Sequence, residues 1–327
     1  MKRRGMLAAV SAVALVALTA CGSGGGGGNS ASGNGKPEKT DVTVGVLPIA
    51  DYAAVYWAQD KGFFKNEGLN VTLKPVQAGP IATQNVATGQ LDFSISNTIS
   101  TSIATQTGLP VKTVVLTSAL GPGGLAVYVK PDSPIRTLKD LNGKTIGINA
   151  TKNIGDVTLR NLLDSEGLKD VKPKFVEVPF PEMLAGVQAG SIDVGYSPEP
   201  FSAAALAAGM RQIVDLADPK GPNAGLAVSN FIASDSFIQA NPNTVNAFIR
   251  AMYKAGGDIT AHQDAFRQFL PGVARVAADV AQQMPLPQFF TATKVDQIQR
   301  VVDLLVGQGL LKKGYDATKY TYIPRSA

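Results

Sequence analysis

The sequence predicts two α/β lobes with mainly parallel sheets, joined by a hinge of two crossings. The first observation behind this prediction is that short apolar runs typical of buried strands alternate with helical runs over residues 42–216. The second is a repeat, in which glycines and polar residues recur 101 positions later. The matching residues are Gly89 and Gly190, Asp92 and Asp193, and Ser96 and Ser197. A period of this length indicates a duplicated domain rather than a solenoid.

The repeat continues in the same order on both sides of these residues. Gly108 matches Gly209, and the run Gly-Leu-Ala-Val at residues 124–127 returns at residues 225–228. Several matches in one order indicate two similar units laid end to end. We therefore expect lobe one to comprise residues 41–126 and 229–327, and lobe two to comprise residues 127–228.

The first copy of the repeat contains alternating strands and helices. Its Val-rich runs are typical of buried strands, Gly89 is suited to end a helix, and Asp51 is suited to cap the N-terminus of the first helix. The expected strands are residues 42–47, 71–76, 91–95 and 112–117, and the expected helices are residues 52–60, 81–88 and 98–105.

The second copy follows the same alternation. Its last helix comes after an unusual loop, Ser197-Pro198-Glu199-Pro200, in which two prolines restrict the backbone on either side of one carboxylate. The expected strands are residues 144–149, 174–178, 192–196 and 212–216, and the expected helices are residues 156–166, 182–189 and 201–208.

Two extended segments and a helical tail complete the predicted body. Residues 124–130 and 225–233 each end one copy of the repeat. Their pattern is typical of hinge segments that cross between lobes or of buried strands, and one segment can be both. In residues 234–327, apolar side chains recur at helical spacing, for example at Val245, Phe248 and Met252. The repeat ends at Val228, so the apolar helix faces of the tail have no partner within a further copy. We therefore expect the tail to pack on lobe one.

The N-terminal residues have the pattern of an export signal. Lys2, Arg3 and Arg4 precede an apolar run that is too short to span a bilayer comfortably, and this run ends at Leu18-Thr19-Ala20-Cys21. The ending resembles the lipobox of bacterial lipoproteins, in which the cysteine carries the lipid. We therefore expect residues 1–21 to be a lipoprotein signal peptide, and the Gly- and Ser-rich residues 22–40 to be a flexible tether.

The charge of the body argues against a nucleic-acid partner. The net charge is +5 and the isoelectric point is near 9.1, but the signal segment contributes three positive charges. Lys36, Glu38 and Lys39 contribute one more, which leaves the body from residue 41 near neutrality. A near-neutral body argues against nucleic-acid binding.

Several segments resemble one family of binding proteins. Residues 62–71 read GFFKNEGLNV and residues 138–148 read LKDLNGKTIGI. These segments, with the loop around Glu199, are similar to the SsuA/THI5-like solute-binding proteins of ABC importers over most of residues 41–228. The resemblance implies a periplasmic-binding-protein-like fold and a monomer that delivers a small molecule to an ABC permease and its ATPase. It does not name the ligand, which in this group is a sulfonate, taurine, nitrate or a pyrimidine precursor. We expect a small organic molecule that is amino-bearing or heterocyclic, or sulfonate- or taurine-like.

The loops that follow the strands supply the candidate ligand-binding residues, because ligands of open α/β sheets bind beyond the carboxyl ends of the strands. These loops carry hydroxyls, amides, aromatic rings and two carboxylates. The candidates are Asp51, Tyr52, Ser96, Asn97, Thr98, Asn149, Thr151, Asn153, Tyr196, Glu199 and Phe201.

Most of these candidates have a structural alternative. Residues 96–98 and 151–153 stand at helix starts, so they either bind polar ligand atoms or cap the helices. Glu199 either accepts from an amine or ring N–H of a ligand or lies against the positive N-terminus of the following helix. Tyr52, Tyr196 and Phe201 either stack on a flat ligand or pack within the lobes.

The sequence argues against catalysis. His262 is the single histidine and lies in the tail, and no cluster of cysteine and histidine predicts a metal site. The family includes a fungal thiamine-pyrimidine synthase that uses a histidine as substrate and has a Cys-rich segment, and this chain has neither feature. We expect a binding protein without cofactor or metal, and the alternative is a sensor or scavenger module without a transporter.

Overall fold

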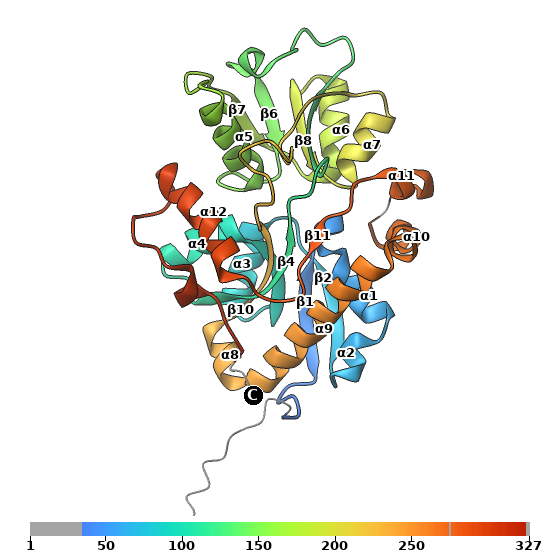
Figure 1. Ribbon diagram of the computed structural model, residues 1–327, viewed down its shortest axis with the longest axis vertical. Coiled ribbons are helices and arrows are strands. Elements are labelled where there is room, and N and C mark those ends of the chain that lie inside the picture. The colour runs from blue at the N-terminus through green and yellow to red at the C-terminus, as the bar shows by residue number, and fades with distance from the viewer. Residues whose placement is uncertain (1–34, 275, 325–327) are drawn as a thin grey trace, which may run out of the picture.

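The computed structural model describes residues 35–274 and 276–324, and it contains two β-sheets with helices on their faces. The predicted signal peptide, Cys21 and most of the predicted tether lie outside the described residues. Figure 1 shows the two sheets in separate lobes, one above the other, with extended segments running between them. No helix among the described residues is long and apolar enough to cross a membrane.

The sheet of lobe one has six strands in the order β11-β4-β10-β3-β1-β2. Its strands are β1 (Asp41–Val46), β2 (Asn70–Pro75), β3 (Phe93–Asn97), β4 (Val111–Ala119), β10 (Ser229–Ser234) and β11 (Gln288–Phe289). The first helices of this lobe are α1 (Ala53–Asp60), α2 (Phe63–Asn66), α3 (Gly79–Ala87) and α4 (Thr98–Gln106), and a 3-10 turn, η1 (Ala50–Tyr52), precedes α1.

The sheet of lobe two has five strands in the order β7-β6-β8-β5-β9. Its strands are β5 (Leu125–Val129), β6 (Thr145–Ile148), β7 (Lys174–Glu177), β8 (Val194–Pro198) and β9 (Arg211–Asp215). Its helices are α5 (Ile154–Ser165), α6 (Phe180–Ala189) and α7 (Phe201–Ala207), and a 3-10 turn, η2 (Leu138–Leu141), precedes β6. The strands and helices expected in both copies of the repeat are confirmed, with ends that move by a few residues.

The prediction of mainly parallel sheets needs a correction, because the sheets are mixed. In each lobe four strands share one direction, but β10 pairs antiparallel with both β3 and β4, and β5 pairs antiparallel with both β8 and β9. Each of these reversed strands is the one that enters its lobe from the other lobe. The two connections between the lobes also bond to each other, since Leu120 N–H donates to the Leu226 carbonyl at 2.9 Å.

The C-terminal segment covers lobe one, as expected. Its helices are α8 (Asp235–Ala240), α9 (Pro242–Ala261), α10 (Gln263–Ala274), α11 (Ala278–Gln283) and α12 (Val295–Gly307), followed by the 3-10 turn η3 (Ala317–Tyr320). Helix α9 packs on α1 and β4, α12 packs on α4, and β11 extends the sheet at β4. The segment also reaches lobe two, where α11 contacts α7 and the Gln308 side chain donates to the Val157 carbonyl at 2.9 Å.

The last residues of the predicted tether bind to lobe one. The Glu38 carboxylate accepts from the backbone N–H groups of Asn243 and Thr244, which lie at the start of α9. The Lys39 ammonium lies 2.8 Å from the Asp92 carboxylate. Glu38 and Lys39 are therefore part of lobe one rather than of the tether. Glu38 also supplies α9 with a cap that its own N-cap side chain does not provide.

Candidate functional site

A small cavity of about 30 Å³ lies between the two lobes. It is lined at the edge where β1, β3 and β4 of lobe one and β6 and β8 of lobe two end, as open α/β sheets predict. The lining residues are Leu47, Ile49, Asp51, Tyr52, Gly79, Ile95, Asn97, Leu120, Leu125, Asn149, Asn153, Ile154, Phe180, Tyr196, Pro198, Val228 and Ser229.

One end of the cavity contains a carboxylate. Asp51 lies in η1, and its Oδ1 accepts hydrogen bonds from Ser118 at 2.9 Å and from Ser229 at 3.1 Å. Burial raises the pKa of this carboxyl above its ordinary value, although the two serine hydroxyls oppose the shift. Asp51 was expected to cap the first helix, but it lies inside the 3-10 turn and its carboxylate faces two strands instead.

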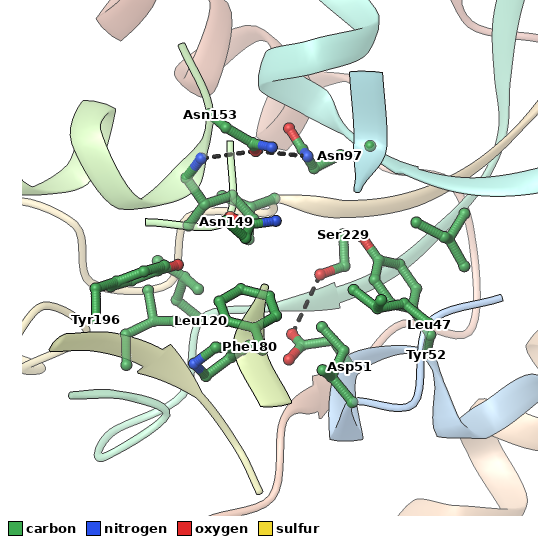
Figure 2. Close-up of a pocket in the computed structure, with 17 residues that line it drawn as sticks. Leu47, Asp51, Tyr52, Asn97, Leu120, Asn149, Asn153, Phe180, Tyr196 and Ser229 are labelled. Atoms are coloured by element: carbon green, nitrogen blue, oxygen red, sulfur yellow. Dashed lines mark hydrogen bonds between the residues drawn. The ribbon is translucent and has the colours of Figure 1, made fainter. Parts of the chain in front are cut away.

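The other end of the cavity contains a pair of amides that joins the lobes. Asn97 Nδ2 donates to Asn153 Oδ1 at 2.8 Å, from the end of β3 in lobe one to the start of α5 in lobe two. Each amide oxygen also caps a helix, because Asn97 Oδ1 accepts from Ser100 N–H and Asn153 Oδ1 accepts from Ile154 N–H. Figure 2 shows this pair above the cavity and Asp51 with Ser229 below it.

Aromatic and aliphatic side chains form the walls between the two ends. Figure 2 shows Phe180 and Tyr196 of lobe two on one side and Tyr52 of lobe one on the other. Tyr52 donates to the Ser96 carbonyl and meets Phe231 edge to face at 5.9 Å between ring centroids. Burial and the charge of Asp51 raise the pKa values of Tyr52 and Tyr196, so both hydroxyls stay protonated at neutral pH.

Several predicted candidates lie away from this cavity. The Ser96 hydroxyl bonds to Thr83 and Thr101 inside lobe one, and Thr98 donates to the Ala227 carbonyl of a connection between the lobes. Thr151 is exposed and binds Glu177. Phe201 does not line the cavity and stacks on Phe180, which does, at 5.9 Å between ring centroids.

Glu199 adopts the helix-terminal alternative. Its Oε2 accepts from Ala203 N–H in the first turn of α7 at 3.3 Å, and the residue is 3% exposed. Burial raises the pKa of its carboxyl from 4.5 to about 7, and the charge of Asp51 adds to the shift. Glu199 and Asp51 together line a smaller pocket beside the main cavity, and the Glu199 carbonyl accepts from Ala50 N–H of lobe one.

The predicted residues that line the cavity are Asp51, Tyr52, Asn97, Asn149, Asn153 and Tyr196. The sequence analysis did not predict Ser229, which also lines the cavity. It was missed because it is the first residue of β10 and does not follow the end of a strand. Since β10 and β5 run antiparallel to their neighbours, their first residues lie at the same edge as the others' last residues. The repeated Gly-Leu-Ala-Val run was the available signal, since Ser229 directly follows its second copy.

The model of the family described as "NMT1/THI5 like" matches residues 49–266, which include every residue lining the cavity except Leu47. The chain belongs to this family. Riboflavin-binding protein RibY of Chloroflexus aurantiacus is 26% identical over 250 residues, which cover 73% of this chain and 69% of that protein.

One further relative and one solved structure show how widely this fold is used. The 4-amino-5-hydroxymethyl-2-methylpyrimidine phosphate synthase of Aspergillus parasiticus is 26% identical over 231 residues, which cover 65% of this chain and 64% of the enzyme. The alkanesulfonate-binding protein SsuA of Xanthomonas axonopodis pv. citri, solved with MOPS bound, superposes with a TM-score of 0.73 at 18% identity, covering 87% of this chain and 99% of that one. The family and its fold therefore include both binding proteins and enzymes.

Proposed function

We propose that this protein captures a small organic molecule between its lobes and delivers it to an ABC importer at the outer face of the cell membrane. The observation that carries the proposal is the cavity itself, whose polar groups come from both lobes and meet in the Asn97–Asn153 bond. A ligand that touches both lobes binds the closed form preferentially, so it shifts the population toward closure. The names of the relatives RibY and SsuA support a binding role.

The ligand can be identified from the protein itself. Protein purified without denaturation is precipitated, and the released small molecules are identified by mass spectrometry. A thermal-shift panel of riboflavin, pyrimidines, taurine, alkanesulfonates and nitrate follows. A ligand at a hundredfold excess over its Kd stabilises the folded state by about 2.7 kcal/mol. A protein that retains no molecule and responds to no compound of a broader metabolite library contradicts the proposed function.

A catalytic role is the alternative suggested by the name of the fungal relative. The single histidine, His262, is exposed at the end of α9, where its Nδ1 lies 3.1 Å from Asp258 Oδ1, and it does not line the cavity. This placement favours binding over chemistry. Incubation of the protein with the identified ligand distinguishes the two, since conversion of the ligand into a product at catalytic enzyme concentrations indicates an enzyme.

The membrane anchor is part of the proposal. If Cys21 carries lipid, Cys21→Ala moves the protein from the membrane fraction to the soluble fraction, because stable anchoring requires more than one acyl chain and a lipoprotein cysteine carries them. Fractionation of cells that express either form measures this. Equal membrane retention of both forms places the anchor elsewhere.

A further inference from the structure

We propose that the two ends of the cavity bind the ligand one after the other, and that the ligand carries a hydrogen-bond donor at one end and an acceptor at the other. Asp51 of lobe one takes a hydrogen-bond donor of the ligand, and Asn153 of lobe two then donates to a ligand acceptor as the lobes close. The ligand class is a molecule that is neutral or zwitterionic, with an N–H donor at one end and an acceptor oxygen at the other. This inference rests on the proposed solute-binding function and assigns the roles of its residues.

The helix caps determine which atom of Asn153 remains for a ligand. Asn97 must turn its oxygen toward Ser100 N–H, so its Nδ2 is the atom that reaches lobe two. Asn153 must turn its oxygen toward Ile154 N–H, and the same oxygen receives Asn97 Nδ2. Asn153 Nδ2 is therefore left over, and it has no hydrogen-bond partner among the residues that the structure describes. An acceptor atom of a ligand would satisfy this buried donor, which is costly to leave unpaired.

Three helix N-termini make the same end of the cavity favourable for an acceptor. Gly79 begins α3, Asn97 precedes α4, and Ile154 begins α5, and all three residues line the cavity. The N-terminus of a helix carries a positive partial charge. Together with the unpaired Nδ2, this arrangement favours a carbonyl, sulfonate or phosphate oxygen.

At the opposite end, lobe one supplies both hydrogen bonds that hold the Asp51 carboxylate. The two groups that orient the Asp51 carboxylate are Ser118 on β4 and Ser229 on β10, and both bonds go to Oδ1. This arrangement does not depend on lobe two, so it is available before closure. By contrast, the Asn153 donor reaches the ligand only when lobe two approaches. The donor end of the ligand is therefore bound first, and its acceptor end is coupled to closure.

The charges of the lining exclude a bare anion. Asp51 is the one carboxylate among the described lining residues, and none of them is Lys, Arg or His. An anion such as nitrate would lose its hydration without a cationic partner and would lie near a negative carboxylate. A zwitterion or a neutral ring with N–H and carbonyl groups avoids both penalties.

The test uses matched pairs of compounds that differ only in the donor. The pairs are taurine and ethanesulfonate, uracil and 1,3-dimethyluracil, and riboflavin and 3-methylriboflavin. Affinity is measured by thermal shift and calorimetry on the full chain. We expect that the donor-bearing member of at least one pair binds about tenfold or more tightly than its partner. Equal binding within every pair, binding of ethanesulfonate or nitrate alone, or no binding by any of the six compounds overturns the assignment. A copurifying molecule of other chemistry would still leave the solute-binding function standing.

Two isosteric variants then separate the roles of the two ends. In Asp51→Asn, the donor-bearing member should lose about tenfold in affinity, the donor-free member should lose little, and saturating ligand should still compact the protein in small-angle scattering. Asn153→Asp keeps the cap oxygen and the acceptor for Asn97 but removes the Nδ2 donor. It should weaken both members by about tenfold and abolish the compaction.

The controls distinguish these effects from loss of folding. Asp60→Asn and Asn66→Asp make the same chemical changes at exposed positions of lobe one and should leave affinity and compaction unchanged. Melting temperatures without ligand verify that all variants fold. If Asn153→Asp closes around the ligand as the unmodified protein does, or if Asp51→Asn weakens both members of a pair equally, the division of roles is wrong.

Discussion

The two copies of the repeat agree in their scaffold and differ at the cavity. Asp92 Oδ2 accepts from Thr43 N–H at 2.9 Å, and its counterpart Asp193 Oδ2 accepts from Thr145 N–H at 2.8 Å. In both copies a carboxylate thus ties the loop before one strand to the neighbouring parallel strand, from β3 to β1 in lobe one and from β8 to β6 in lobe two. The helices before these loops end at glycines with nearly the same positive φ, +75° at Gly89 and +76° at Gly190.

The copies diverge a few residues later. Asn97 and Thr98 of lobe one correspond to Pro198 and Glu199 of lobe two in the repeat. Thr98 bonds to a connection between the lobes, whereas Glu199 is a buried carboxyl at the start of α7. The two copies therefore share the contacts that hold each sheet together and differ in the residues near the cavity.

The largest expected effect concerns Glu199, the carboxyl that takes the place of Thr98 in the second copy. The pKa of Glu199 is raised from 4.5 to about 7, so the folded state binds its proton more tightly than the unfolded state does. The free energy of unfolding should therefore fall as pH rises from about 4.5 to 7, by about 3 kcal/mol from this group. Glu199→Gln should flatten the slope, and the raised pKa values of Asp51 and Asp156 should leave a remainder of the same sign.

Urea unfolding at pH 5, 6, 7 and 8 measures this slope. Glu182→Gln, an exposed change in the first turn of α6, is the control and should leave the slope unchanged. A Glu199→Gln variant with the slope of the unmodified protein would show that burial of the carboxyl is not the cause.

The next effect concerns one glycine in each lobe, Gly45 on β1 and Gly147 on β6. A Cβ at Gly45 would lie 2.1 Å from Ser94 Oγ, and one at Gly147 would lie 2.4 Å from Met183 Sδ. Alanine at either position should lower the free energy of unfolding by about 1–3 kcal/mol through overpacking. The loss should be larger at Gly45, because Ser94 lies on an adjacent strand while the Met183 side chain can move.

Denaturant titration of the two alanine variants measures these losses. Gly272→Ala is the control, because a Cβ there meets nothing within 4 Å, and alanine favours the helix by up to about 1 kcal/mol. If either core variant is as stable as the control, that glycine is not required by packing, and the shared scaffold would be a coincidence of sequence at that point.

A smaller effect separates the two repeated carboxylates. Asp92 is buried and also accepts from the Lys39 ammonium, whereas Asp193 is exposed. Asp92→Asn should destabilise the protein by about 1–3 kcal/mol and Asp193→Asn by less than about 1 kcal/mol, because hydrogen bonds to buried charged groups contribute more. Thermal unfolding of both variants compares the two losses of stability. A larger loss in Asp193→Asn would contradict a stabilising role for the Lys39–Asp92 contact.

The scaffold was predictable because local and long-range signals in the sequence agree. Apolar runs gave the strands, glycines such as Gly190 gave the helix ends, and the repeat gave two lobes. The antiparallel direction of β5 and β10 was not predictable, because an apolar run such as residues 125–129 has the same pattern in either direction. Their direction follows from the path of the chain, since each strand returns from the other lobe.

The site was predictable only in part for a related reason. The rule that ligands bind beyond strand ends located Asp51, Asn97 and Asn153, but it missed Ser229 on a reversed strand. It also could not tell a side chain that faces the cavity from one that caps a helix or packs inside a lobe. Ser96 and Glu199 have suitable chemistry and sequence positions, yet the hydrogen-bond partners of their side chains lie within their own lobes. Such outcomes depend on tertiary contacts that one sequence does not encode locally.

The most direct test of the account is the distance between the lobes with and without ligand. Cys21 is the only cysteine, so a Cys21→Ser background allows spin labels to be placed at Ala207→Cys on α7 and Asp279→Cys on α11, which line opposite sides of one groove. If the lobes close on the ligand, the identified ligand should shift the distance distribution to shorter and narrower values, and Asn153→Asp should suppress the shift. An unchanged distribution at saturating ligand would contradict capture by closure of the two lobes.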